Sequence, residues 1–360
     1  MPRTTTHAAL AASLDRHLAR VARRRARKGL PAPQARVEAP GFLYRSGADD
    51  PFHIASIGKL ATTALIAQQL DRGALSLETP VAKLLPASET RGLFLSPESD
   101  VTVAHLLSHT SGVADYFDDP AAGGNVRRQV VTDPERFWTP AELLDFGRTH
   151  QKPVGAPGER FHYSDTGFAL LGRIMEELTG DGFPQLVRRR VFEPAGMTSS
   201  VTWQREPGPV RIAPLWLDGV EASAFRSISC DWAGGGIVST VDDLARLGTA
   251  LTDGTLVSRE TWTRITQPAN RMRPGIHYGQ GVMQLRFDGF MPLLRGLPRP
   301  VGHLGVLSTH LFVDVERGTS VVLNFHDTRE MVPSFQTHIR IAQGLARLSV
   351  NQLTTGVSTS

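Results

Sequence analysis

The spacing of apolar residues predicts a chain that starts with one helix and a hairpin and continues mainly as helices. Leu10, Leu14, Leu18 and Val21 recur at helical spacing, and "ARVEAPGFLYRSG" alternates around a turn at 39–41. Further periodic segments predict helices over 56–72, 103–108, 139–149, 166–179 and 183–192. "TVDDLARLGTALTDG" predicts another helix, capped by Ser239 or Thr240.

From His277 onward the pattern becomes alternating, which predicts strands in "HYGQGVMQLRF", "STHLFVDVE" and "TSVVLNFH", the last two joined at Gly318. A final helix is expected over about 333–348. This order favours an α+β fold, in which an antiparallel sheet flanked by helices is interrupted by a helical insertion. We expect a discontinuous sheet domain at 8–62 and 222–350, a mainly helical domain at 63–221 and a flexible tail at 351–360.

Composition excludes several classes of protein. A chain of 360 residues that is 41% hydrophobic can bury a large core, and no apolar run is long enough to span a bilayer. The N-terminal segment has no continuous apolar stretch, so we expect no secretory signal. The single cysteine, Cys230, excludes an internal disulfide and favours a reducing compartment, so we expect a cytoplasmic location.

Positive charge is concentrated at the N-terminus, where residues 1–28 hold eight Lys or Arg against only Asp15. A nucleic-acid or membrane contact is one interpretation. The favoured alternative is a helix that docks by its leucine stripe and leaves its arginines in water. Nothing downstream is typical of a nucleic-acid module, so we expect no nucleic-acid partner.

The stretch "HIASIGKLATTALIAQQLDRGAL" predicts an amphipathic helix with Lys59 in its first turn, where a cation opposes the helix dipole. Ser56 and Lys59 are three residues apart and would share one face. A serine hydroxyl becomes a nucleophile when a neighbouring base takes its proton, and a lysine can serve that role or support another base. By itself, S-x-x-K is a weak signal that favours a capping serine followed by a surface lysine.

Further motifs follow in a fixed order. "FHYSDTG" stands about a hundred residues after S-x-x-K, and "VGHLGVLSTHLFVDV" follows at Val301. The order S-x-x-K, Y-x-N, then K-T-G or H-x-G resembles that of the serine β-lactamase and penicillin-binding superfamily. The resemblance spans roughly residues 50–345 and is strongest to the class C β-lactamase-like branch, with family VIII carboxylesterases, D-aminopeptidases and 6-aminohexanoate-dimer hydrolases. It implies a β-lactamase-like fold.

The resemblance also implies roles for three side chains. Ser56 would be the acylated nucleophile, Lys59 its activating neighbour, and Tyr163 the general base with a phenol kept acidic by nearby cations. Whether the lysine or the tyrosine takes the first proton stays open.

In the third motif, His303 would stand where the family has the lysine of K-T-G. Gly305 and Val306 would follow on the strand, and the N–H of Val306 would form an oxyanion hole with that of Ser56. A mostly neutral imidazole is a weaker anion site than lysine plus threonine. Simple esters or amides are therefore expected ahead of penicillins.

The second motif departs from the family pattern, because Asp165 replaces the usual asparagine. An ionised aspartate accepts but does not donate, so we expect it to pair with Lys59, keep that group protonated and shift the base role to Tyr163. It would repel an acylamino carbonyl and favour an amine-bearing substrate. Alternatively, Ser164 or Asp165 simply caps the helix over 166–179, and both can hold.

Other candidate residues are interpreted as structural. His109 and Asp115 resemble parts of a triad but lie in a family turn, so we assign them no catalytic role. "AGGGIVST" lacks the lysine of a P-loop and is expected to allow close backbone approach. Histidine spacing fits no metal motif, so we expect neither metal nor cofactor.

Together these features predict a serine hydrolase that acts through an acyl-enzyme on a small ester or amide. A D-amino-acid amidase or peptidase, or an acyltransferase, is the alternative on the same site. A catalytically silent binding protein on this scaffold is the alternative of another class. The acyl group, the leaving group and the oligomeric state stay open.

Overall fold

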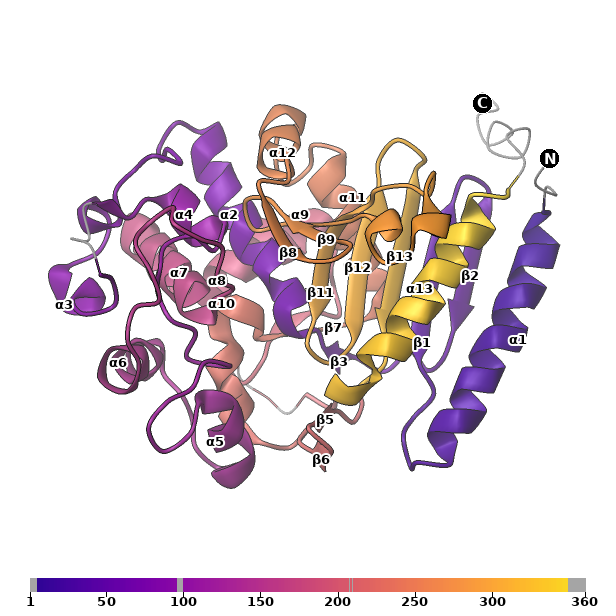
Figure 1. Ribbon diagram of the computed structural model, residues 1–360, viewed down its shortest axis with the longest axis horizontal. Coiled ribbons are helices and arrows are strands. Elements are labelled where there is room, and N and C mark those ends of the chain that lie inside the picture. The colour runs from indigo at the N-terminus through magenta and orange to yellow at the C-terminus, as the bar shows by residue number, and fades with distance from the viewer. Residues whose placement is uncertain (1–4, 96–99, 207, 209, 349–360) are drawn as a thin grey trace.

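The computed structural model describes residues 5–95, 100–206, 208 and 210–348. Its centre is an eight-stranded antiparallel sheet in the order β2-β1-β13-β12-β11-β10-β9-β8 (Figure 1). The strands are β1 (Gln34–Ala39), β2 (Phe42–Ser46), β8 (Asn270–Arg273), β9 (Ile276–Tyr278), β10 (Met283–Leu285), β11 (Val301–Gly305), β12 (Thr309–Asp314) and β13 (Thr319–Asn324). β1 pairs with β13, which brings the N-terminal and C-terminal parts of the chain into one sheet. β1 also pairs with β2, and β12 with β13, so the expected antiparallel sheet and its hairpins are confirmed.

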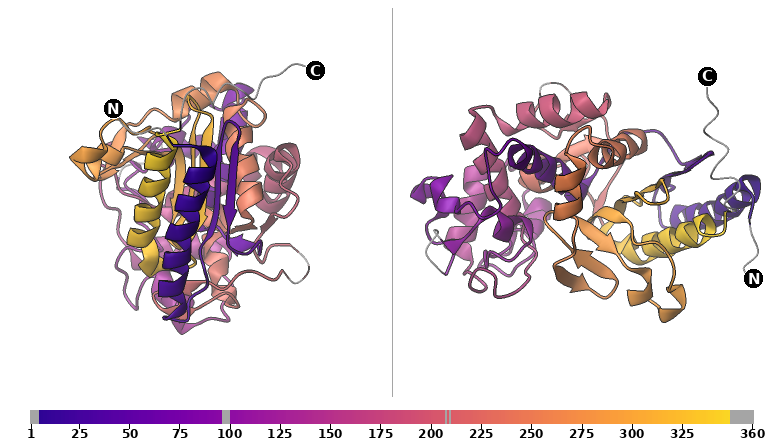
Figure 2. Two further views of the ribbon diagram at one scale, coloured as in Figure 1. Left: turned by 90° about the vertical axis from the view of Figure 1, so that its right-hand side faces the viewer. Right: turned by 90° about the horizontal axis from the view of Figure 1, so that it is seen from above.

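Helices cover both faces of this sheet. α1 (His7–Ala26) and α13 (Met331–Leu345) lie side by side on one face, as Figures 1 and 2 show. α11 (Val241–Thr252) packs against β1, β12 and β13 on the other face. Its first turn is capped by Thr240, whose side chain accepts the N–H of Asp243.

The arginine-rich N-terminal helix is docked through its apolar stripe. Leu10, Leu14 and Leu18 are buried against the sheet and α13, which confirms docking by the leucine stripe. The expectation that the arginines lie in water is wrong for Arg25, which is buried. Its guanidinium pairs with Glu330 at 3.2 Å and donates to the carbonyl of Phe325 at 2.6 Å, and these contacts anchor the end of α1.

Most of the remaining elements lie between residues 63 and 221 and form the helical side of the molecule, and the others lie outside that range. The helices are α2 (Lys59–Asp71), α3 (Ala87–Thr90), α4 (Val103–Leu107), α5 (Val126–Thr132), α6 (Pro140–His150), α7 (Asp165–Thr179), α8 (Phe183–Val187), α9 (Glu193–Ala195), α10 (Trp232–Gly235) and α12 (Arg259–Ile265). The small strands are β3 (Phe52–His53), β4 (Val201–Thr202), β5 (Trp216–Leu217), β6 (Val220–Glu221) and β7 (Ile237–Ser239). We propose that the boundaries between the sheet domain and the helical domain lie at residues 62 and 221. The expected tail at 351–360 lies outside the described residues.

The prediction of an amphipathic α2 is wrong. Every residue from Lys59 to Ala67 is buried, because α7, α8, α10, α12 and β11 surround the helix on all sides. The alternative of a capping serine and a surface lysine is wrong for the same reason, since Lys59 is fully buried and Gly58 occupies the N-cap. None of the described helices is long and apolar enough to cross a membrane.

A buried histidine pair joins α13 to the sheet. Ser334 donates to the carbonyl of Met331, so its oxygen accepts from Nε2 of His310 at 2.8 Å. Nδ1 of His310 therefore accepts from Nδ1 of His338 at 3.1 Å. Burial lowers the pKa of His338 from 6.5 to about 3, and both rings are neutral at neutral pH.

We predict that this pair makes the fold sensitive to acid. The pKa of His338 is about 3 in the folded protein and 6.5 in the unfolded chain. Its contribution to folding stability is therefore complete above pH 6.5 and is lost as the pH falls from 6.5 towards 3. By pH 5 the loss for one such histidine is on the order of 2 kcal/mol. Urea unfolding at pH 7.5 and 5.0 should show a smaller loss in His338→Asn, which keeps a neutral donor, than in the wild type. Equal losses in the two proteins would refute the prediction.

Candidate active site

Ser56 lies in a tight turn between the sheet and the helical side. A short 3-10 turn, Ala55–Gly58, leads into α2, and Ala55 adopts a left-handed backbone with φ of 51°. A Cβ on Gly235 would lie 2.8 Å from the carbonyl carbon of Ala55, and one on Gly305 would lie 2.7 Å from the carbonyl oxygen of Ile54. Glycines on both sides therefore allow α10 and β11 to approach the turn, as expected for the "AGGG" segment.

Lys59 is fully buried and its ammonium has three acceptors. It donates to the hydroxyl of Ser56 at 3.2 Å and to the carbonyl of Gly234 at 2.8 Å, and it forms a short ion pair with Asp165. The expected pairing of Lys59 with Asp165 is confirmed. The three acceptors match the three ammonium protons, so this buried charge is fully compensated.

The segment that carries Tyr163 and Asp165 is held by the turn before it. The N–H of Ser164 donates to Nδ1 of His109 at 3.1 Å, and that of Asp165 donates to the carboxylate of Asp115 at 3.0 Å. The side chain of Ser164 caps α7, so the expected cap is confirmed. His109 and Asp115 therefore support the site from beneath.

Tyr163 lies next to both Ser56 and Lys59. The Lys59 ammonium is 5.0 Å from the centre of the Tyr163 ring and 3.2 Å from the Ser56 hydroxyl. Burial and the charge of Asp165 raise the pKa of Tyr163 well above its usual value. The expectation of a phenol kept acidic by cations is wrong for this arrangement, because burial and the carboxylate outweigh the ammonium.

In the third motif, both ring nitrogens of His303 are engaged within the protein. Nδ1 contacts the carbonyl of Leu304 at 2.7 Å, so Nε2 accepts from the hydroxyl of Tyr278 at 3.0 Å. Burial and Lys59 lower the pKa of His303 to about 3, which keeps it neutral. Its ring centre lies 6.4 Å from that of Tyr163.

A small cavity adjoins the serine turn and includes two residues that sequence reasoning missed. His53 and Asp231 line a space of about 30 Å³ together with Ala55 and Val306. Burial and Asp165 raise the pKa of Asp231 to about 7. The position of Asp231 three residues before the first glycine of the glycine run was the available signal, and His53 carried none.

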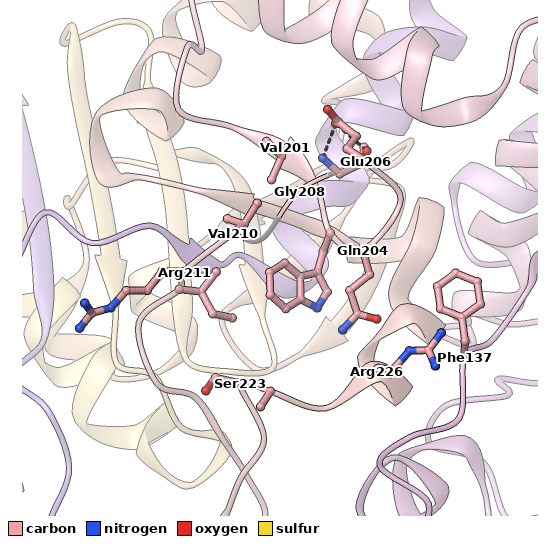
Figure 3. Close-up of a pocket in the computed structure, with 13 residues that line it drawn as sticks. Phe137, Val201, Gln204, Glu206, Gly208, Val210, Arg211, Ser223 and Arg226 are labelled. Atoms are coloured by element: carbon pink, nitrogen blue, oxygen red, sulfur yellow. Dashed lines mark hydrogen bonds between the residues drawn. The ribbon is translucent and has the colours of Figure 1, made fainter.

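A larger pocket lies elsewhere, around Trp203 (Figure 3). It has a volume of about 500 Å³, and its walls include Phe137, Val201, Gln204 and Arg226. No predicted site residue lines it, so we place the candidate site at Ser56.

Comparison with known proteins agrees with this geometry. The sequence model of the Beta-lactamase family matches residues 10–346. The chain belongs to the Beta-lactamase family.

Named relatives of this Beta-lactamase family member include hydrolases and penicillin-binding proteins. Esterase EstB of Burkholderia gladioli is 28% identical over 319 residues, which cover 76% of this chain and 77% of the esterase. Penicillin-binding protein 4 of Amycolatopsis lactamdurans is 33% identical over 181 residues, or 49% of this chain and 43% of that protein. The chain spans about half the length of the first curated relatives that it matches.

A solved structure shows the same fold over nearly the whole chain. The D-stereospecific amidohydrolase from Streptomyces sp. superposes with a TM-score of 0.73 at 25% identity, covering 88% of this chain and 94% of the amidohydrolase. The expected α+β, β-lactamase-like fold is therefore confirmed.

The close approach of α10 to the serine turn yields a prediction. In Gly235→Ala, the new Cβ would meet the Ala55 backbone at 2.8 Å, so the turn or α10 must move. We expect a loss of about 3 kcal/mol in the free energy of unfolding, measured with urea. Gly147→Ala in α6 is the matched control, because its Cβ stays 3.5 Å from the nearest atom. Equal stability of the two variants would refute this account.

Proposed function

We propose that this protein is a serine hydrolase in which Ser56 forms an acyl-enzyme with a small ester or amide. One observation carries the proposal: the buried Lys59 ammonium donates to the Ser56 hydroxyl at 3.2 Å and lies 5.0 Å from the centre of the Tyr163 ring, while Ser56 and Tyr163 are partly exposed. This arrangement supplies a nucleophile, a fixed cation and a candidate base within reach of one another.

In the proposed reaction, Lys59 is ion-paired with Asp165 and acts as a cation rather than as the base. Tyr163 reacts in its ionised form, whose charge the ammonium offsets. The phenolate takes the Ser56 proton while Oγ attacks the substrate carbonyl, and it returns that proton to the leaving group. Water then attacks the acyl-enzyme with the same base. The raised pKa of the resting phenol makes the ionised form a minor population.

The negative oxygen that forms during attack needs donors, and we propose the backbone N–H groups of Ser56 and Val306 for this role. Ser56 lies at the start of a helical turn, where the N–H has no intrahelical acceptor. Val306 follows β11 and lines the same cavity as Ala55. Gly305 allows this approach, and His303 supports the strand from within rather than contacting substrate.

Ester hydrolysis is the favoured reaction. EstB, which is similar over 76% of this chain, is an esterase, and no cation occupies the third motif, where the family pattern has the lysine of K-T-G. Hydrolysis of an amide that bears an amino group is the second candidate. The carboxylate of Asp165, with 13% of its side chain exposed beside Lys59, favours it. We also keep a cytoplasmic location as a proposal, based on the single buried thiol of Cys230.

The first test is covalent labelling. Incubation with a fluorophosphonate probe, followed by intact-mass measurement, should add one label to the wild type and none to Ser56→Ala. Turnover of a p-nitrophenyl ester should fall by about 10⁴-fold in the variant. Equal labelling of both proteins, or of neither, would contradict the assignment, and the second outcome would favour a silent binding protein.

The second test concerns Asp165. In Asp165→Asn the negative charge beside Lys59 is lost, so the ratio of kcat/KM for an amine-bearing ester over a neutral ester should fall by about tenfold. Asp145→Asn removes the same charge from an exposed position and is the control. Loss of folded protein without a change in this ratio would show that Asp165 mainly supports α7.

A further inference from the structure

His53 contacts the backbone directly before the proposed nucleophile. Its side chain is 1% exposed, and Nδ1 accepts the N–H of Ala55 at 3.2 Å. A neutral imidazole carries one proton, so this contact places the proton on Nε2. Burial lowers the pKa of His53 to about 4, which keeps the ring neutral at neutral pH.

The residue that His53 contacts is strained. Ala55 has a φ of 51°, a left-handed conformation that costs an L-residue about 1 kcal/mol. The φ and ψ angles of Ala55 set the direction of the next peptide unit, whose N–H belongs to Ser56. The hydrogen bond from Ala55 to His53 holds the preceding peptide unit, Ile54–Ala55. It therefore supports the Ala55 conformation that orients a proposed oxyanion donor.

The other edge of the His53 ring faces an acid. Nε2 is buried and has no hydrogen-bond partner among the described residues, and the carboxylate of Asp231 lies 3.7 Å from it. Above pH 7, where Asp231 is ionised, its carboxylate favours the proton on Nε2. With the proton on Nδ1 instead, two N–H groups would face each other at 3.2 Å.

We propose that His53 is a positioning residue, held in one tautomer by Asp231, that anchors the Ala55 N–H, holds the left-handed Ala55 conformation and so aims the Ser56 N–H at the developing oxyanion. This rests on the proposed acyl-enzyme function. It adds a role for two residues outside the Ser56, Lys59 and Tyr163 group, and it involves no proton transfer by His53.

Three substitutions of His53 test the roles of its two ring nitrogens separately. In His53→Asn, the oxygen of the new side-chain amide stands near the place of Nδ1 and can accept an N–H two residues on, as in an Asx turn. His53→Gln places its amide near Nε2 and loses the acceptor for Ala55. His53→Ala loses both. We expect kcat for a p-nitrophenyl ester within about threefold of wild type in His53→Asn, and about 10²-fold lower in the other two. KM should change by less than about threefold in all of them.

A double-mutant cycle tests the link to Asp231. Asp231→Asn should lower kcat several-fold in the wild-type background and have no effect in His53→Asn, where Nε2 is absent. Equal effects in the two backgrounds would remove Asp231 from the proposal.

A measurement on the wild-type protein tests the proposal even if the variants fail to fold. Long-range ¹H–¹⁵N correlation spectra of the wild-type protein report the tautomer of each histidine, and we expect the proton of His53 on Nε2. A proton on Nδ1, or equal kcat in His53→Asn and His53→Gln, would overturn the inference while Ser56 is still labelled by fluorophosphonate. Absence of that label from the wild type would instead overturn the proposed function.

Discussion

The site depends on one buried charge, the ammonium of Lys59. An ammonium without water is stable only when each proton meets an acceptor, and three separate segments supply these acceptors. Ser56 comes from the preceding turn, Asp165 from the start of α7 and the Gly234 carbonyl from α10. The packing of these segments around α2 is therefore fixed by electrostatics as well as by apolar contact, and the same contacts bring the proposed nucleophile, cation and base together.

This constraint also explains why the glycines cluster where they do. A Cβ on Gly234 would lie 2.9 Å from the Asp165 carboxylate, and one on Gly58 would lie 2.9 Å from the Cα of Gly235. The backbone of α10 can reach the ammonium because these positions carry no side chain. A glycine-rich stretch that resembles a nucleotide loop in sequence thus serves here as a backbone acceptor and a packing surface.

Much of the fold and the main residues of the site could be predicted from the sequence. Spacing placed Ser56 and Lys59 together, the family resemblance brought Tyr163 and Asp165 to the same site, and alternation located most of the sheet. Features that depend on distant segments were not predictable. The burial of α2 on all sides comes from neighbours far along the chain, the Gly234 acceptor is a backbone group, and the raised pKa of Tyr163 follows from burial that no spacing reveals.

Two departures from the family pattern act in the same electrostatic direction. A lysine in the third motif would add a cation, but His303 is buried, hydrogen-bonded and neutral. An asparagine in the second motif would be neutral, but Asp165 adds an anion. Each change makes the site more negative by one charge, which disfavours a substrate carboxylate and favours an ammonium. The same added anion raises the pKa of Tyr163, so the charge that would select the substrate also reduces the population of the ionised base.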